Sequence, residues 1–155
     1  GSEMCIRDSS IEGGKEKAMS VVKSKQTEGK LLVVTKAREL ATYTIKICSN
    51  EKNFPKRYRW CITAKIVDCA IDVSSNVNAA NSIYVNDDNK KDYQLRRQYQ
   101  TKALAETYAL LSMIDIAYSV FSIESKRIEY WTRLVNEVQV LLRNWRKSDY
   151  DRYGK

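Results

Sequence analysis

The sequence predicts an all-α protein, folded as an antiparallel up-and-down bundle of four helices. Residues that break helices are scarce, because the 155 residues include only five Gly and one Pro, whereas a β-sandwich needs many turns. Apolar residues also recur at helical spacing, most regularly between Ile128 and Trp145. The helical stretches are joined by short links, which favour antiparallel neighbours.

The ends of the chain differ from this helical pattern. Residues 1–18 begin with Gly1-Ser2, typical of a cleaved tag, and show no helical or strand period. We therefore predict a tag-like or disordered leader over residues 1–18 and a flexible N-terminus over residues 19–29. The bundle itself is predicted over residues 30–147, followed by a polar, frayed tail over residues 148–155.

The first predicted helix covers residues 30–49. A single apolar stripe supports it, formed by Val33, Ala37, Leu40, Thr44 and Ile47. A polar loop follows, and Pro55 then marks the start of the next helix, since proline is tolerated in a first helical turn.

The second predicted helix covers residues 56–85 and has two apolar rows. One row contains Trp60, Ala64, Val67 and Ile71. The other row contains Ile62, Ile66, Cys69, Val73 and Val77. One stripe is enough for a surface helix, so two rows indicate either a central place in the bundle or a subunit interface.

The third and fourth predicted helices complete the bundle. Residues 86–89 offer good N-cap residues for a helix over residues 90–121, which is apolar on more than one side in its second half. Asp115 lies in that apolar half, and a structural ion pair or a subunit contact is favoured there over catalysis. The last helix covers residues 125–147, with a stripe at Ile128, Trp131, Val135, Val138, Leu142 and Trp145.

The charge of the chain is positive. Lys and Arg number 27 against 19 Asp and Glu, which gives a net charge of +8 and a pI of about 9.3. The leader does not supply this excess, because it holds more acidic than basic residues. Such a balance indicates an anionic partner, with a solvated lysine-rich surface as the alternative.

The composition disfavours an enzyme. Without histidine, the chain lacks the commonest general base and every zinc site that needs imidazole. The four cysteines form no Cys-x-x-Cys pair, and we interpret them as small buried hydrophobic residues of a reduced cytoplasmic protein; Cys61 and Cys69 are expected to share a helix face. We predict no catalytic residue, no metal site and no cofactor. No apolar run approaches a membrane span, so no membrane contact is predicted.

Basic residues gather in three clusters that also contain aromatic residues. The first lies at the start of the second helix, around Tyr58 and Trp60, and opposes the helix dipole there. The second lies at the start of the third helix, and the third at the end of the last helix, and antiparallel packing would bring these two together. Cations neutralise phosphates and aromatic rings stack on unpaired bases. The predicted nucleic-acid-binding residues are Lys56, Arg57, Arg59, Lys65, Lys90, Lys91, Arg96, Arg97, Arg143, Arg146 and Lys147.

Two stretches resemble a known family. The second helix begins with Phe54-Pro55-Lys56-Arg57-Tyr58 and continues to Asp72-Val73-Ser74-Ser75-Asn76-Val77, and the last helix carries Leu134-Val135-Asn136-Glu137-Val138 and Leu141-Leu142-Arg143-Asn144-Trp145. This order resembles the accessory variability proteins of diversity-generating retroelements. It also resembles the four-helix-bundle proteins of ribosomal RNA intervening sequences, which usually continue the Ser-Asn stretch with Ala-Glu-Gly, where this chain has Asn78-Ala79-Ala80-Asn81.

The resemblance implies a homopentameric barrel of bundles. It also implies a basic surface that binds RNA or DNA, and association with the reverse transcriptase of the element. We therefore predict a non-enzymatic nucleic-acid-binding accessory protein. The alternative is a structural or protein-interaction scaffold whose positive charge is incidental.

Overall fold

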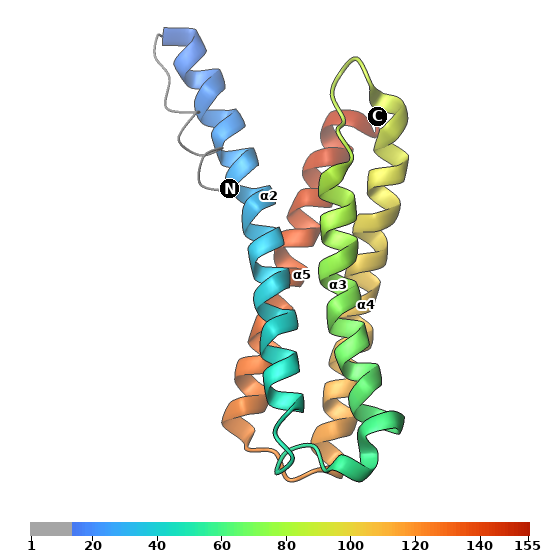
Figure 1. Cartoon of the computed structure of the whole chain (residues 1–155). Coiled ribbons are helices and arrows are strands. Elements are labelled where there is room, and N and C mark those ends of the chain that lie inside the picture. Colours follow the sequence, from blue (N-terminus) through green and yellow to red (C-terminus); the bar gives the residue numbers. More distant parts are fainter. Residues whose placement is uncertain (1–13) are drawn as a thin grey trace.

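The computed structural model describes residues 14–155 of the chain, and their side chains from Gly29 onward. Four long helices make up most of it, with no strand between residues 14 and 155, which confirms the predicted all-α class (Figure 1). The long helices are α2 (Gly14–Cys48), α3 (Ala64–Ser82), α4 (Tyr93–Val120) and α5 (Ser125–Tyr153). The short ones are the 3-10 helix η1 (Lys56–Tyr58), the π-helix η2 (Arg59–Thr63) and the 3-10 helix η3 (Lys90–Asp92).

Each long helix packs against two others. The pairs in contact are α2 with α3, α3 with α4, α4 with α5, and α5 with α2. Figure 1 shows the α3–α4 connection and the C-terminus at one end, which we name the C-terminal end. The connections that follow α2 and α4 lie at the opposite end, which we name the loop end. The four helices thus enclose one core.

The predicted stripes of the first and last helices form that core. Val33, Ala37, Leu40, Thr44 and Ile47 are all buried on α2. On α5 the stripe from Trp131 to Trp145 is buried, and Ile128 packs against it. Trp131 is fully buried, and its indole Nε1 donates a hydrogen bond of 2.9 Å to the hydroxyl of Thr44. This bond ties α2 to α5 near the loop end.

An aromatic cluster closes the loop end. The ring of Phe54 lies 5.4 Å from that of Phe121 and 6.0 Å from that of Trp131, measured between ring centroids. Tyr58 also contacts Phe121, at 5.1 Å. These edge-to-face contacts stabilise the connection between α2 and α3.

The two apolar rows of the second predicted helix differ in burial. Ile66, Cys69, Val73 and Val77 are buried in the core. In the other row Trp60 is 82% and Ile71 40% exposed, whereas Ala64 and Val67 are half-buried and Val67 packs against the core. The backbone explains part of the difference, because the predicted continuous helix begins as η1 and η2, and a π-helix changes the direction of the side chains that precede it. Among the described residues, therefore, one row is buried in the core and the other is exposed at Trp60 and Ile71.

Several predicted boundaries need correction. Helix α2 begins at Gly14, so residues 19–29, predicted to be flexible, have helical backbone, while residues 1–13 of the predicted leader lie outside the described part. Helix α5 continues to Tyr153, so most of the predicted frayed tail is helical. Its extension has a physical cause, because Asp149 is buried against α4.

Two of the described cysteines are buried, as expected, whereas Cys61 and Asp115 are exposed. Cys48 and Cys69 are buried, and burial raises the pKa of each thiol to about 12. Cys61 is exposed, so it does not share a face with Cys69. Asp115 is exposed on α4 and forms no ion pair with any side chain from residue 29 onward.

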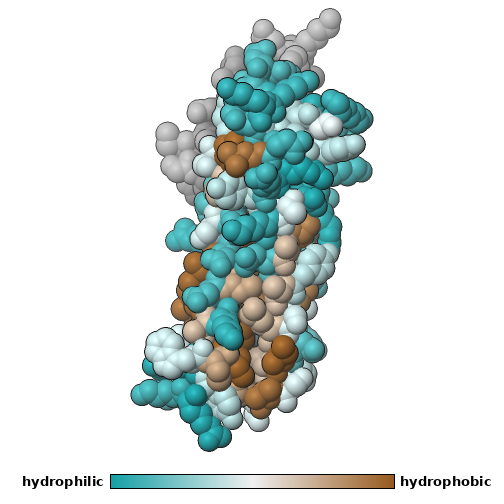
Figure 2. Space-filling model, turned by 90° about the vertical axis from the view of Figure 1, so that its right-hand side faces the viewer, coloured by the Kyte–Doolittle hydropathy of each residue, from teal (hydrophilic) through white to brown (hydrophobic). Residues whose placement is uncertain are grey.

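The surface divides into polar and apolar regions. Figure 2 shows a hydrophilic upper part and a hydrophobic area in the lower half of one face. The second half of α4 contributes two exposed aliphatic residues, Ile116 and Val120, which are 52% and 53% exposed. By length and composition alone, residues 90–120 are apolar enough to cross a membrane, contrary to expectation. This helix packs against both α3 and α5, and 28% of its most apolar stretch is buried within the chain.

Candidate nucleic-acid interface

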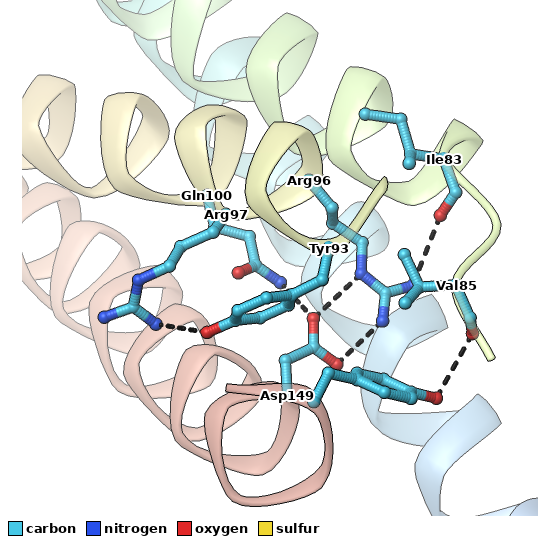
Figure 3. A network of polar contacts seen from close by, with 8 residues as sticks. Ile83, Val85, Tyr93, Arg96, Arg97, Gln100 and Asp149 are labelled. Carbon is cyan, nitrogen blue, oxygen red and sulfur yellow. Dashed lines mark hydrogen bonds and ion pairs between the residues drawn. The ribbon is translucent and has the colours of Figure 1, made fainter. Parts of the chain in front are cut away.

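A buried ion pair joins α4 to α5 at the C-terminal end. Arg96 donates from Nε and one terminal nitrogen to the two carboxylate oxygens of Asp149, each at 2.8 Å (Figure 3). Its other terminal nitrogen donates to the carbonyl of Ile83 at 3.2 Å, and Gln100 donates to Asp149 at 2.9 Å. This network fixes the start of α4, the end of α3 and the end of α5 to one another.

Arg96 is therefore not a phosphate contact, and the prediction for this residue is wrong. Its side chain is 3% exposed, and its charge is already compensated by Asp149. The rings of Trp145 and Tyr153 lie 5.9 Å and 5.8 Å from the guanidinium carbon. A phosphate could reach Arg96 only if this network opened.

The neighbouring Arg97 points away from that network. Figure 3 shows its guanidinium on the other side of Tyr93, whose hydroxyl accepts a hydrogen bond of 3.0 Å from it. The guanidinium also lies 5.7 Å from the ring centroid of Tyr150 on α5. Tyrosine rings thus hold Arg97 at the surface, half-buried and without a carboxylate partner among residues 29–155.

Arg146 on α5 adds a second cation beside Arg97. Burial lowers the pKa of its guanidinium, and the charge of Arg97 lowers that pKa further. Its Nε is buried and has no hydrogen-bond partner in the described part of the chain. Two like charges held together without an acidic neighbour favour an anion between them.

The same face of α5 extends toward the middle of the bundle. Arg143 donates a hydrogen bond to the hydroxyl of Tyr108 on α4, and its guanidinium lies 5.5 Å from the centroid of that ring. Lys147 is exposed on α5, and Lys90 and Lys91 are exposed on η3. The second and third predicted clusters therefore meet at the C-terminal end.

A cavity of about 390 Å³ opens beside the buried pair, and its lining includes residues of both α2 and α5. Its lining includes Lys30, Arg96, Trp145, Asp149 and Tyr153. Burial lowers the pKa of Lys30, and the nearby charge of Arg96 lowers it further. The cavity wall is thus cationic, like the outer surface of this end.

Most of the first cluster lies at the loop end, while its Lys65 lines a surface pocket with Lys102 and Glu106 of α4. Lys56 and Arg57 are on η1, Arg59 is on η2, and Lys65 is in the first turn of α3. All four side chains are exposed. Arg57 lies 5.2 Å from the ring centroid of Tyr58, which is anchored in the aromatic cluster. Of the three clusters predicted from the sequence, the second and third therefore lie together.

Sequence reasoning missed the buried pair. Asp149 was assigned to the polar tail, yet it continues the α5 stripe one turn beyond Trp145, and Arg96 falls in register with the buried Ala103 and Leu110. These two positions are the signal that could have identified the pair.

No group of three or more Cys, Asp or Glu side chains from residue 29 onward is arranged to hold a metal ion. Comparison with known proteins adds no relative, because no family model, curated protein or solved structure matches this chain.

Proposed function

We propose that this chain is a non-enzymatic accessory protein that binds RNA or DNA through its basic surface. Support comes from one observation above all. Apart from Arg96, every predicted binding residue is exposed or half-buried, and none forms an ion pair with any side chain in the described part. Uncompensated cations at a surface favour a polyanion, because binding releases the counterions condensed on its phosphates.

Arg97 and Arg146 are the central phosphate-binding residues in this proposal. Tyr93 and Tyr150 hold Arg97 in place before any ligand arrives, so less side-chain entropy is lost on binding. Contacts of this kind position a nucleic acid without reading its sequence. We therefore expect little sequence specificity.

The proposed protein partner is the reverse transcriptase of a diversity-generating retroelement, by the sequence resemblance alone. The same resemblance is the basis for proposing a homopentameric barrel, whereas the short links support an antiparallel bundle and the cysteines support a cytoplasmic location. The exposed Ile71 on α3 and the exposed Ile116 and Val120 on α4 are compatible with subunit contacts. These apolar residues also favour the second candidate, a protein-interaction scaffold that binds no nucleic acid.

Fluorescence anisotropy tests the proposed binding. The full chain is titrated into labelled 20-nucleotide RNA, single-stranded DNA and duplex DNA at several salt concentrations. We expect dissociation constants of roughly 1–100 μM near physiological salt, with affinity that falls steeply as salt increases. No binding of any of the three at low salt would contradict the proposal and favour the scaffold.

A pair of matched variants locates the surface. Arg143→Gln with Lys147→Gln removes two exposed cations from α5, and Arg38→Gln with Lys46→Gln removes two exposed cations from α2. The α5 variant should flatten the salt dependence on duplex DNA by about two units of slope, since each lost phosphate contact contributes about 0.9. The α2 variant should behave like the wild type. Equal losses in both variants would show that only net charge matters.

A further inference from the structure

Trp60 is the most exposed large apolar side chain among the described residues. Its side chain is 82% exposed, whereas Trp131 and Trp145 are buried. It lies on the π-helix η2, and such helices are frequent at functional sites. No ring, cation or hydrogen-bond partner from residue 29 onward contacts its indole. Both faces of the indole are therefore open.

The surroundings of Trp60 are cationic. Lys56, Arg57 and Arg59 precede it within four residues, Lys65 follows it, and no acidic residue occurs between Lys52 and Lys65. The neighbouring rings of Phe54 and Tyr58 are engaged with Phe121. These ring contacts fix the backbone next to Trp60, while its indole and the neighbouring basic side chains remain exposed to solvent.

We propose that Trp60 is a base-stacking residue, and that the loop end binds unpaired nucleic acid in preference to duplex. This inference rests on the proposed function and specifies its ligand. An indole face stacks on an unpaired base of any identity, while flanking cations hold the backbone. In a duplex the faces of the bases are covered by their neighbours, so the cations could bind phosphates but Trp60 would find no base.

Charge argues against a second copy of this chain as the partner of Trp60. A copy docked on the same surface would place its own Lys56, Arg57 and Arg59 near those of the first chain. Like charges across an interface disfavour it. A nucleic acid strand supplies both the negative charge and the flat apolar surface that this site needs.

The test compares Trp60→Ala with a matched variant of another exposed aromatic. Tyr84 is 73% exposed in the α3–α4 connection, away from the loop end, so Tyr84→Ala is the control. Both variants are titrated by anisotropy against a labelled 15-nucleotide oligo-dT and a 15-base-pair duplex. Trp60→Ala should bind oligo-dT roughly tenfold more weakly, with duplex affinity and salt slope unchanged, because stacking is not an electrostatic contact. Tyr84→Ala should match the wild type on both ligands.

Intrinsic fluorescence supplies an independent measurement. Oligo-dT should quench the emission of the exposed tryptophan in the wild type, and the duplex should not. Trp60→Phe keeps an aromatic face and should retain most of the preference for oligo-dT. This variant keeps the proposal testable if Trp60→Ala does not fold.

The outcomes separate the two proposals. If Trp60→Ala binds oligo-dT as tightly as the wild type, the stacking role is overturned while nucleic-acid binding stands. If Trp60→Ala instead loses self-association in sedimentation, a second copy covers the indole and the inference is wrong. If the wild type binds neither ligand, the proposed function fails and the inference fails with it.

Discussion

The pair formed by Arg96 and Asp149 shows how one residue type serves two purposes in this chain. Arg97, the next residue, has a tyrosine ring and a hydroxyl around it but no carboxylate. Arg96, in contrast, donates two hydrogen bonds to the carboxylate of Asp149. The first arrangement leaves a charge available to a ligand, and the second uses the charge to fix helices. Helical position decides between them, because α4 places Arg96 inward.

Removal of Asp149 tests the structural role. Asp149→Ala would leave Arg96 buried without its partner, so we expect a loss of roughly 3–5 kcal/mol in the free energy of unfolding. Asp151→Ala, an exposed position on the same helix, is the matched control and should change it by less than about 0.5 kcal/mol. Urea unfolding followed by circular dichroism measures both. Equal stability of the two variants would mean that solvent reaches Arg96 readily.

At the scale of the elements, a polar contact inside the core joins α2 to α5. The Thr44 hydroxyl accepts from Trp131 and donates to the carbonyl of Leu40 at 2.8 Å, so both of its hydrogen-bonding functions are used. Thr44 belongs to the apolar stripe of α2 although it is polar. A polar residue fits in that stripe because the indole of Trp131, on the opposite side of the core, donates a hydrogen bond to its hydroxyl.

Thr44→Val keeps the shape of the side chain and removes the hydroxyl. The Trp131 indole nitrogen then has no acceptor, and we expect a loss of about 1–3 kcal/mol in the free energy of unfolding. Thr42→Val, on the exposed side of the same helix, should be nearly neutral. Thermal unfolding of both variants in the same buffer compares their midpoint temperatures. A midpoint for Thr44→Val equal to that of the wild type would contradict the importance of this bond.

Sequence periodicity predicted the helices but not which residues of different helices contact each other. The stripes around Leu40 and Val138 were correct because each helix buries one face, and a spacing of three to four residues reveals that face. Trp60 was assigned to an apolar row because the rule assumes regular α-helix, whereas η2 is a π-helix. The role of Asp149 depends on Arg96, 53 residues earlier in the chain, and no local pattern records such a distant partner.

Of the candidate site, only the clusters of basic residues could be predicted from the sequence. The second and third clusters were correctly placed together, because the start of α4 and the end of α5 lie at the same end of the bundle. Which cations remain free was not predictable, because it depends on where carboxylates lie in space. Arg96 differs from Arg97 only by one position in the helix, and that difference decides its burial.

At the scale of the whole molecule, the apolar area on α4 and the basic ends suit different partners. Ile116 and Val120 are more than half exposed and lie in the half of α4 that is nearer the loop end. Apolar exposure of this kind is a common feature of subunit interfaces. The proposed assembly would bury these residues and leave the cations at the two ends accessible.

Sedimentation of the full chain tests this assembly. The chain has a mass of 17.9 kDa, so a pentamer would have a mass of about 90 kDa. Ile116→Glu with Val120→Glu should shift the mass toward the monomer, while Leu32→Glu, at an exposed apolar position on α2, should not. A wild type that sediments as a monomer at high concentration would exclude the pentamer.

The outermost cations of the two basic surfaces, those on η3 and those on η1, lie at opposite ends of α4. Its 28 residues span about 42 Å at 1.5 Å each. A duplex rises 3.4 Å per base pair, so that length corresponds to about 12 base pairs, slightly more than one turn of the double helix. A shorter oligonucleotide could contact one end of the bundle at a time, and two such molecules could occupy one chain. A longer one could bridge both ends, and its second contact would form at a high effective concentration. Ligand length would then set both stoichiometry and avidity.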